Sequence, residues 1–140
     1  MAEQRAVRWN MMKAACPTRQ VIDRIANKWT MMVILSLEEG TLRFSELRGR
    51  IEGVSQKMLT QTLRGMESDG LIERTVYPTV PVTVEYTLTE LGASLSSTMD
   101  VVRQWAYGHI GDIEAARQDY VQRADESDAS ENSANAVRAS

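Results

Sequence analysis

The chain has 140 residues, of which 43% are hydrophobic, and it carries one cysteine and a formal net charge of −3. This length predicts one domain with a modest core, and a single cysteine excludes an internal disulfide framework. The apolar runs fall far short of the ~20 residues that a membrane span needs, and the charged N-terminus is unlike a signal peptide. We therefore expect a cytoplasmic protein without a membrane partner.

The acidic charge is concentrated near the C-terminus. Residues 111–140 contain seven acidic and three basic side chains, whereas residues 40–64 contain two acidic and five basic ones. A positive patch can therefore lie on a protein whose acidity lies elsewhere. The net charge neither supports nor excludes binding to nucleic acid.

Three helices are predicted before residue 52. Pro17 suits the first turn of a helix whose apolar face contains Val21, Ile22 and Ile25. Residues 29–37 are apolar nearly all round, which predicts a buried central helix. A third, short helix is indicated by the spacing of three apolar residues, Phe44, Leu47 and Ile51.

A fourth helix is predicted after a tight turn that contains Gly53. Ser55 is a suitable N-cap, and the inward face consists of three apolar residues at helical spacing, Leu59, Leu63 and Met66. Gly70 is expected to end this helix in the left-handed conformation. Two helices joined by a tight turn predict a helix-turn-helix.

The sequence pattern changes from helical spacing to alternation after Leu71. Residues 72–77 predict one strand, and residues 82–88 alternate between apolar and polar side chains, which predicts a second, half-buried strand. Pro78 and Pro81 place a loop between them, because two prolines this close cannot both lie inside a sheet ladder. The expected fold class is mainly α with a small β-hairpin wing (α+β), a winged helix-turn-helix with terminal dimerisation helices.

A long helix is predicted after Thr89, with interruptions at Gly108 and Gly111 and a last helical segment to about Val121. From Asp125 onward the sequence is small, polar and acidic, so we expect a disordered tail. The helices carry more apolar surface than a small core can cover, through Trp105, Tyr107, Ile110, Ile113 and Tyr120. This surplus favours a partner subunit, and packing against the chain's own domain is the alternative.

Several ordered blocks of sequence resemble those of one family. They are Cys16-Pro17, Asn27 to Thr30, Arg43 to Leu47, Val54 to Arg64, Asp69 to Ile72, Val84 to Tyr86 and Leu88 to Gly92. Between about Cys16 and Glu114 the chain resembles the HxlR-type winged helix-turn-helix regulators of bacteria, relatives of the MarR group. The resemblance implies a DNA-binding transcriptional repressor that acts as a homodimer on an inverted-repeat operator in double-stranded DNA. It also implies sensing of quinones, other electrophiles or oxidants through Cys16.

The resemblance and the predicted elements divide the chain into three parts. Residues 1–15 are expected to form an N-terminal arm or helix that contacts the dimer partner, residues 16–114 the HxlR-type winged helix-turn-helix domain, and residues 115–140 the end of the C-terminal helix and the disordered acidic tail. One departure concerns the wing. The family often carries a basic residue before its Val-Glu-Tyr motif, where this chain has Val80-Pro81-Val82-Thr83. We therefore expect this wing to hold DNA less strongly.

The candidate DNA-reading surface is the polar side of the fourth helix. Glutamine can pair with adenine, lysine and arginine with guanine, and the threonine methyl group with that of thymine. The residues opposite the inward face are Gln56, Lys57, Thr60, Gln61 and Arg64, and they include no acid. We expect them to supply base contacts and phosphate anchoring; the alternative is an ordinary solvated helix face.

Five further residues are candidates for weaker DNA contacts. Lys28, Arg43 and Ser55 lie at or near predicted helix starts, where backbone amides favour phosphate. Helix capping or a solvated charge is the alternative for each. Thr79 and Val80 lie at the predicted wing tip, where they either approach the minor groove or form a passive turn.

Cys16 precedes Pro17 at a predicted helix start, with Lys13 and Arg19 nearby in sequence. A helix N-terminus and adjacent cations stabilise a thiolate, which is the reactive form. Oxidation would produce a sulfenic acid, which a second thiol captures. Because the chain has no other cysteine, that thiol would be Cys16 of the other subunit or a small thiol. The alternative from the residues alone is an inert cysteine that fills space.

An enzyme is not expected. The single histidine, His109, lies far from Cys16 in sequence, no Gly-rich phosphate loop is present, and no catalytic residue, metal site or cofactor is predicted. Two alternatives to a thiol-switched regulator remain. One is a winged-helix regulator that responds to a small ligand near Trp105 and Tyr107, and the other is a winged helix that serves as a protein-interaction module.

Overall fold

The computed structural model describes residues 9–139, and the chain forms two compact units. The first ends at Asp100 and is called the winged-helix unit below; the second begins at Val101 and is called the C-terminal unit. The winged-helix unit combines helices with a three-stranded antiparallel sheet. The predicted fold class, mainly α with a β-hairpin wing, is confirmed.

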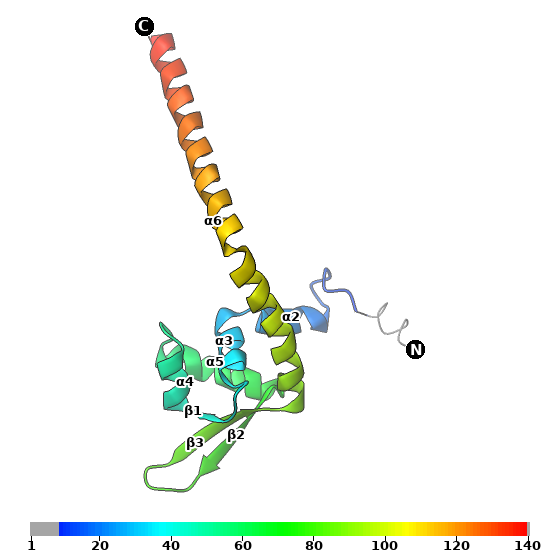
Figure 1. Ribbon diagram of the computed structural model, residues 1–140. Coiled ribbons are helices and arrows are strands. Elements are labelled where there is room, and N and C mark those ends of the chain that lie inside the picture. The colour runs from blue at the N-terminus through cyan, green and yellow to red at the C-terminus, as the bar shows by residue number, and fades with distance from the viewer. Residues whose placement is uncertain (1–8, 140) are drawn as a thin grey trace. The chain divides into compact units, whose positions relative to one another are not determined.

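The helices and strands follow one another in the predicted order (Figure 1). They are α2 (Pro17–Ile25), α3 (Lys28–Ser36), β1 (Leu42–Arg43), α4 (Phe44–Arg50), α5 (Gln56–Ser68), β2 (Ile72–Tyr77), β3 (Thr83–Leu88) and α6 (Glu90–Ala139). The first strand of the hairpin has the predicted bounds, and the second begins at Thr83, one residue later than predicted. The short strand β1 is an element that the sequence pattern does not predict.

Side chains cap the starts of α3 and α5. The Asn27 side chain accepts a hydrogen bond from the Trp29 amide at 2.9 Å, and Ser55 Oγ accepts one from the Met58 amide at 3.0 Å. Each bond satisfies one of the amides that a helix start leaves without a partner. The predicted capping role of Ser55 is therefore confirmed.

The end of α5 and the start of α6 are tied together. Gly70 has a φ of +75°, the left-handed conformation predicted for it, and the Leu71 amide donates to the Met66 carbonyl at 2.9 Å. Thr89 Oγ1 donates to the Gly70 carbonyl at 2.6 Å and accepts from the Gly92 amide at 3.0 Å. A Cβ atom at position 92 would collide with the Leu71 carbonyl, so glycine lets α6 lie directly against this turn.

The core of the winged-helix unit is formed by the inward faces of its helices and one face of the sheet. Its most completely buried large side chains are Ile34, Leu47, Leu59, Leu63, Met66 and Val33. The inward face predicted for the fourth helix is thus confirmed. The helix at residues 29–37 is buried on one side only, because Val33 and Ile34 face the core while Met32 is 40% exposed.

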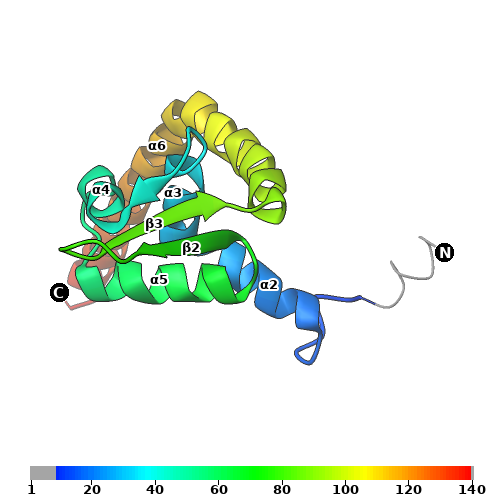
Figure 2. The same ribbon diagram turned by 90° about the horizontal axis from the view of Figure 1, so that it is seen from below.

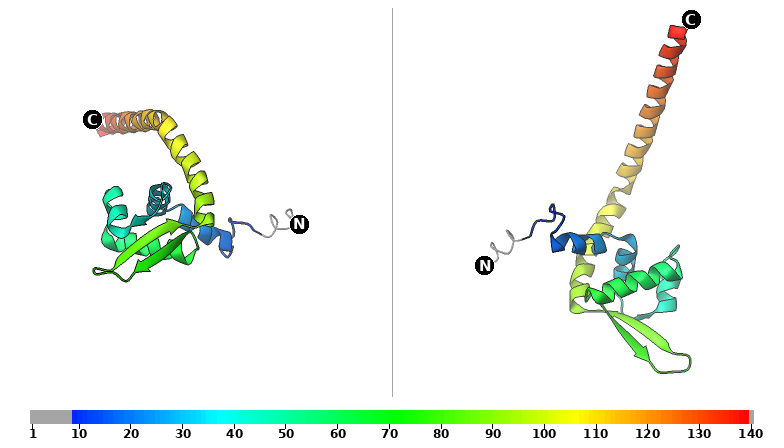
Figure 3. Two further views of the ribbon diagram at one scale, coloured as in Figure 1. Left: turned by 60° about the horizontal axis from the view of Figure 1, so that its bottom comes forward. Right: turned by 180° about the vertical axis from the view of Figure 1, so that it is seen from behind.

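The sheet has the strand order β1-β3-β2, and every pair is antiparallel. Leu42 of β1 lies opposite Tyr86 of β3, which fixes the start of α4 beside the hairpin. Figure 2 shows α5 running alongside β2, and in both views of Figure 3 the hairpin extends past the helices of the winged-helix unit. The hairpin is therefore exposed toward its tip, where Val82 lies outside β3 and is exposed rather than half-buried as predicted.

Helix α6 differs from the sequence-based expectation in two ways. It continues without a break through Gly108 and Gly111, and it includes residues 125–139, where the sequence predicts a disordered tail. Glycine costs a helix about 1 kcal/mol relative to alanine but keeps its amide donor. Since no proline follows Pro81, nothing in the covalent chain interrupts the backbone hydrogen bonds of this helix.

The described part of the N-terminal arm forms turns rather than a helix. The Asn10 carbonyl accepts from the Lys13 amide at 3.0 Å, and the Lys13 carbonyl accepts from the Cys16 amide at 3.1 Å. Residues 1–8 of the predicted arm lie outside the described residues. None of the helices within residues 9–139 combines the length and the apolar character that a membrane-spanning helix needs.

Candidate nucleic-acid interface

Helix α5 presents two chemically different faces. Leu59, Leu63 and Met66 point into the core, and Leu59 is 0% exposed. The opposite face is exposed at Gln56, Lys57, Gln61 and Arg64 and half-buried at Thr60. These five side chains border one shallow hollow on the surface. The structure thus brings together all five residues selected from the sequence as candidates for DNA reading.

The charges on this face are available to a ligand. Lys57 and Arg64 have no ion-pair partner within residues 9–139. The Thr60 hydroxyl donates to the Gln56 carbonyl at 2.8 Å, so its proton is used within the helix while its methyl group and lone pairs remain. The face therefore combines two cations with two free amides, which are the groups that contact phosphates and base edges.

The candidates at helix starts have contacts of their own. Lys28 Nζ lies 4.7 Å from the centroid of the Trp29 ring, a cation–π contact. Arg43 Nε lies 3.9 Å from Glu85 Oε1, and its backbone amide donates to Glu46 Oε1 at 3.1 Å. Both cations are thus partly engaged by the chain itself, and the ion pair of the exposed Arg43 contributes little to stability.

The wing tip is apolar and uncharged. Val80 is fully exposed, and the Thr79 hydroxyl donates to the Pro81 carbonyl at 2.9 Å. This bond closes the turn, so the hydroxyl proton of Thr79 is directed into the hairpin loop. The side chain that the wing tip offers to a partner is that of Val80.

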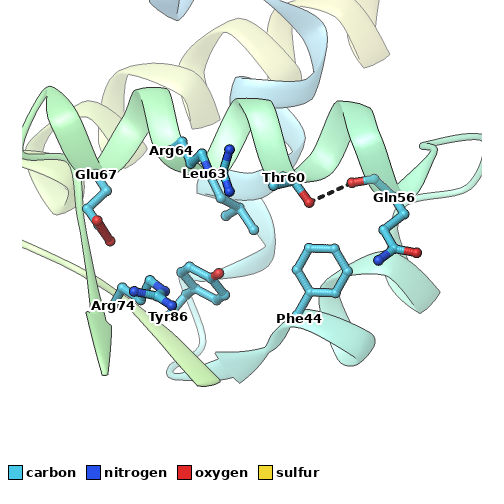
Figure 4. A pocket seen from close by; sticks show the side chains of 8 residues that line it. All are labelled: Phe44, Gln56, Thr60, Leu63, Arg64, Glu67, Arg74 and Tyr86. Carbon is cyan, nitrogen blue, oxygen red and sulfur yellow. Dashed lines mark hydrogen bonds between the residues drawn. The ribbon is translucent and has the colours of Figure 1, made fainter. Parts of the chain in front are cut away.

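A pocket at the base of the wing contains a residue that the sequence analysis misses. The pocket has a volume of about 370 Å³ and lies between α5 and the hairpin, and Arg74 of β2 lines it (Figure 4). Arg74 follows Ile72 by two residues in a strand, so alternation places both on the same face of the sheet. That spacing is the signal in the sequence that could have identified it.

A second feature missed from sequence is an apolar groove in the winged-helix unit. It has a volume of about 400 Å³ and is lined mainly by aliphatic side chains of α2 and the first turns of α6, including Val21, Ile25, Leu91 and Leu95. At its rim, Arg24 Nε lies 2.7 Å from Asp69 Oδ2. The apolar spacing within each helix is visible in the sequence, but the groove exists only because the two helices lie together.

Cys16 lies at the N-cap position of α2 and is half-buried. Its Sγ atom is 2.6 Å from Thr18 Oγ1. The hydrogen bond with the Thr18 hydroxyl lowers the pKa of the thiol below its ordinary value, partial burial acts in the opposite direction, and nearby backbone amides add to the lowering. The structure therefore assigns the main cause to Thr18, and not to the cations Lys13 and Arg19 considered from sequence.

No group of three or more His, Cys, Asp or Glu side chains in the described part of the chain is arranged to hold a metal ion. His109 Nδ1 lies 2.8 Å from the Trp105 carbonyl, and the two rings stack with centroids 4.7 Å apart. This histidine is thus engaged within its own helix.

A solvent-facing polar helix in a helix-turn-helix, placed beside a β-hairpin, defines a winged-helix DNA-binding protein. The chain belongs to the HxlR-like helix-turn-helix family, whose model matches residues 24–114. The family resemblance inferred from the ordered sequence blocks is thereby confirmed.

Three similar proteins are transcriptional regulators. The HTH-type transcriptional regulator YtfH of Escherichia coli K12 is 39% identical over 110 residues, which are 79% of this chain and 87% of that protein. The structure of the transcriptional regulator ytfH from Salmonella typhimurium has a TM-score of 0.76 and 37% identity, and the match covers 79% of this chain and 98% of that one. The redox regulator HypR in its reduced form has a TM-score of 0.66 and 34% identity over 71% and 98% of the two chains. The protein is thus a transcriptional regulator with a helix-turn-helix fold, and its family consists of regulators rather than enzymes.

Proposed function

We propose that the protein represses transcription as a homodimer that binds an inverted-repeat operator through α5. The observation that carries this proposal is the exposed polar face of α5, because its side chains are of the types that pair with base edges. In this assignment Gln56, Thr60 and Gln61 contact bases, while Lys57 and Arg64 contact bases or phosphates. Repression requires that the bound dimer overlap the promoter and so exclude RNA polymerase.

The homodimer is supported by the apolar side chains of the C-terminal unit. Trp105 is 57% exposed and Tyr107 is 75% exposed, and Ile110 and Tyr120 are exposed on the same helix. A second copy carries the same apolar surface, so a two-fold pair covers both. Two recognition helices related by a two-fold axis match two inverted half-sites, spaced ~10 bp centre to centre or a multiple of that.

The remaining candidate residues are assigned supporting contacts. Ser55, Lys28 and Arg43 anchor phosphates near helix starts, where backbone amides and the helix dipole favour an anion. Val80 makes an apolar contact with the minor groove, and Thr79 holds the turn that presents it. Because the wing tip has no charge, these wing contacts contribute less affinity than α5.

The DNA-binding proposal is tested by titrating the protein with DNA from its own upstream region at several salt concentrations. We expect a specific complex with two half-sites, whose affinity falls steeply as salt rises. Gln61→Ala should lower the discrimination between bases by about 1–3 kcal/mol at one position of each half-site. The matched control Gln118→Ala on α6 should leave the affinity for every operator variant unchanged. Two results contradict the assignment and favour a protein-interaction module. One is an affinity for DNA that does not depend on salt concentration, and the other is a Gln61→Ala protein with unchanged affinity at every operator position.

Cys16 is the proposed sensor of oxidants, quinones or other electrophiles. Its support is the hydrogen bond with Thr18, which lowers the pKa of the thiol, and the similarity to a redox regulator. A hydroperoxide oxidises the thiolate to a sulfenic acid and leaves as an alcohol, and a second thiol then displaces water to form a disulfide. Since the chain has one cysteine, the second thiol is Cys16 of the other subunit or a small thiol. Either product changes the spacing of the two recognition helices.

A Cys16→Ser variant separates this mechanism from a second candidate, a regulator that responds to a small ligand. The apolar groove of about 400 Å³ on the winged-helix unit favours that candidate, because its volume is in the range of small-molecule sites. If Cys16 is the sensor, diamide or a quinone releases the wild-type protein from DNA and leaves the variant bound. Release of the Cys16→Ser protein by the same compound contradicts the thiol switch and supports the ligand.

A further inference from the structure

The pocket at the base of the wing joins the two parts of the winged-helix unit that approach DNA. Arg64 and Glu67 line it from α5, Arg74 and Tyr86 from the hairpin, and Phe44 from the start of α4. Figure 4 shows Glu67 extending from α5 toward the strands and the Arg74 side chain lying beside Tyr86. Gln56 and Thr60 of the α5 polar face border the same pocket, so it is continuous with the candidate base-reading surface.

Arg74 occupies an unusual position for a charged residue. It lies opposite Tyr86 in the sheet register, and directly opposed residues of an antiparallel pair share one face. On that face Ile72 and Tyr86 are buried, so Arg74 extends the core-facing row of the sheet toward the wing tip. Arg74 is itself exposed, and its side chain lines the pocket between α5 and the hairpin, so its guanidinium is open to a ligand that enters from solvent.

The charges that line the pocket do not cancel. Two arginines face one carboxylate, and neither Arg64 nor Arg74 forms an ion pair within 4.0 Å among the described residues. Two guanidinium groups in one concave site form a set of donors that suits a phosphate group. The pocket thus carries the surplus positive charge that an anion site needs.

We propose that this pocket binds one phosphate of the DNA backbone, with Arg74 and Arg64 as its ligands. The inference rests on the proposed function, in which α5 lies in the major groove and the hairpin lies beside the adjacent minor groove. The sugar-phosphate strand that separates these two grooves must pass between α5 and the hairpin, which is where the pocket lies. Arg74 then supplies the basic contact that the wing tip lacks.

Glu67 makes the site selective for DNA over a free anion. Its carboxylate repels a lone phosphate, whereas a phosphate within the DNA strand is held in place by all other contacts of α5. Removal of this charge by Glu67→Gln should therefore strengthen DNA binding.

The test is the salt dependence of DNA binding by the full-length Arg74→Gln protein, measured from about 50 to about 200 mM salt. Loss of one phosphate contact makes the negative slope of log affinity against log salt shallower by about 0.9. Over this range the affinity of the variant therefore falls about 3.5-fold less than that of the wild type. The loss of affinity should be equal for all operator variants, because a phosphate carries no sequence information. Arg74→Lys should keep the slope, and the charge-matched control Arg117→Gln on α6 should leave both affinity and slope unchanged.

The possible results separate this inference from the proposed function. If the wild type binds its operator and Arg74→Gln keeps the full salt slope, the phosphate site is wrong while the DNA-binding function stands. If the wild type binds no DNA, both are wrong. Titration of the free protein with inorganic phosphate should give no Arg74-dependent binding; a signal that Arg74→Gln abolishes would mean that the pocket serves a free phosphate compound, and would overturn the assignment to DNA.

Discussion

Helix α5 and the C-terminal unit use their apolar residues in opposite ways. In α5 every large apolar side chain of the inward face is buried, with Leu59 and Met66 at 0% exposure. In residues 101–139 no side chain is buried, although this segment carries Trp105, Tyr107 and Ile110. The apolar side chains on the inward face of α5 are therefore buried within the chain's own fold, whereas those of the C-terminal unit are exposed and can be buried only against another surface.

This difference teaches which parts of the protein depend on association. A side chain buried in its own domain stabilises that domain at any protein concentration. An exposed apolar side chain gains its burial energy only when a second surface covers it, so its contribution depends on concentration. Truncation of a side chain to alanine should accordingly change the free energy of unfolding in α5 and the strength of self-association in the C-terminal unit.

The largest effect is expected for Leu63→Ala in the core of the winged-helix unit. Deletion of this buried side chain should lower the free energy of unfolding by about 2–5 kcal/mol, through lost burial and the cavity that remains. Urea denaturation at fixed protein concentration measures it. Met58→Ala, on the same helix but exposed, should cost about 1 kcal/mol or less. Equal costs for the two variants would break the contrast, because α5 would then not be a one-sided core helix.

A smaller effect, of another kind, is expected for Trp105→Ala in the C-terminal unit. The exposed indole should belong to the dimer contact, so its removal should weaken self-association about 10-fold or more while the unfolded fraction at low concentration stays unchanged. Sedimentation equilibrium measures the dimer dissociation constant, and the neighbouring Gln104→Ala serves as the control. A Trp105→Ala protein that dimerises like the wild type would show that this apolar surface has another use.

The smallest effect is expected for Thr18→Val beside Cys16. The Thr18 hydroxyl lowers the pKa of the thiol, so its loss should move the pKa back up, leaving less thiolate at neutral pH. The rate of Cys16 alkylation by iodoacetamide, followed against pH, should rise at a higher pH in the variant than in the wild type. Thr75→Val, in the exposed part of β2, should leave the profile unchanged. Identical profiles for wild type and Thr18→Val would remove Thr18 as the cause of thiol reactivity.

Features formed by residues close together in sequence were predicted better than contacts between segments far apart in sequence. The bounds of β2, the cap at Ser55, the left-handed Gly70 and the two faces of α5 all follow from residues within a few positions of one another. Such features depend on local hydrogen bonds and on the helical or strand period. The candidate base-reading face was predictable for the same reason, since its five residues lie on one helix.

Features that join distant segments were not predictable. The pairing of Leu42 with Tyr86 and the groove between α2 and α6 depend on contacts across long stretches of chain. The sequence pattern predicts each of the two segments, but it does not predict which distant segment each one contacts. The continuation of α6 through Gly108 was missed for a related reason, because a glycine permits a helix break but does not impose one.

The amino-acid sequence alone therefore determined the order of the helices and of the hairpin strands, the family and the polar face of α5, since spacing and caps act over one or two helical turns. Only the tertiary structure decided that Arg74 and Arg64 line one pocket and that Gly92 lies against the Leu71 carbonyl. The physical reason is that packing selects one arrangement among the many that the same local pattern allows, and it does so through contacts that carry no signature in sequence spacing.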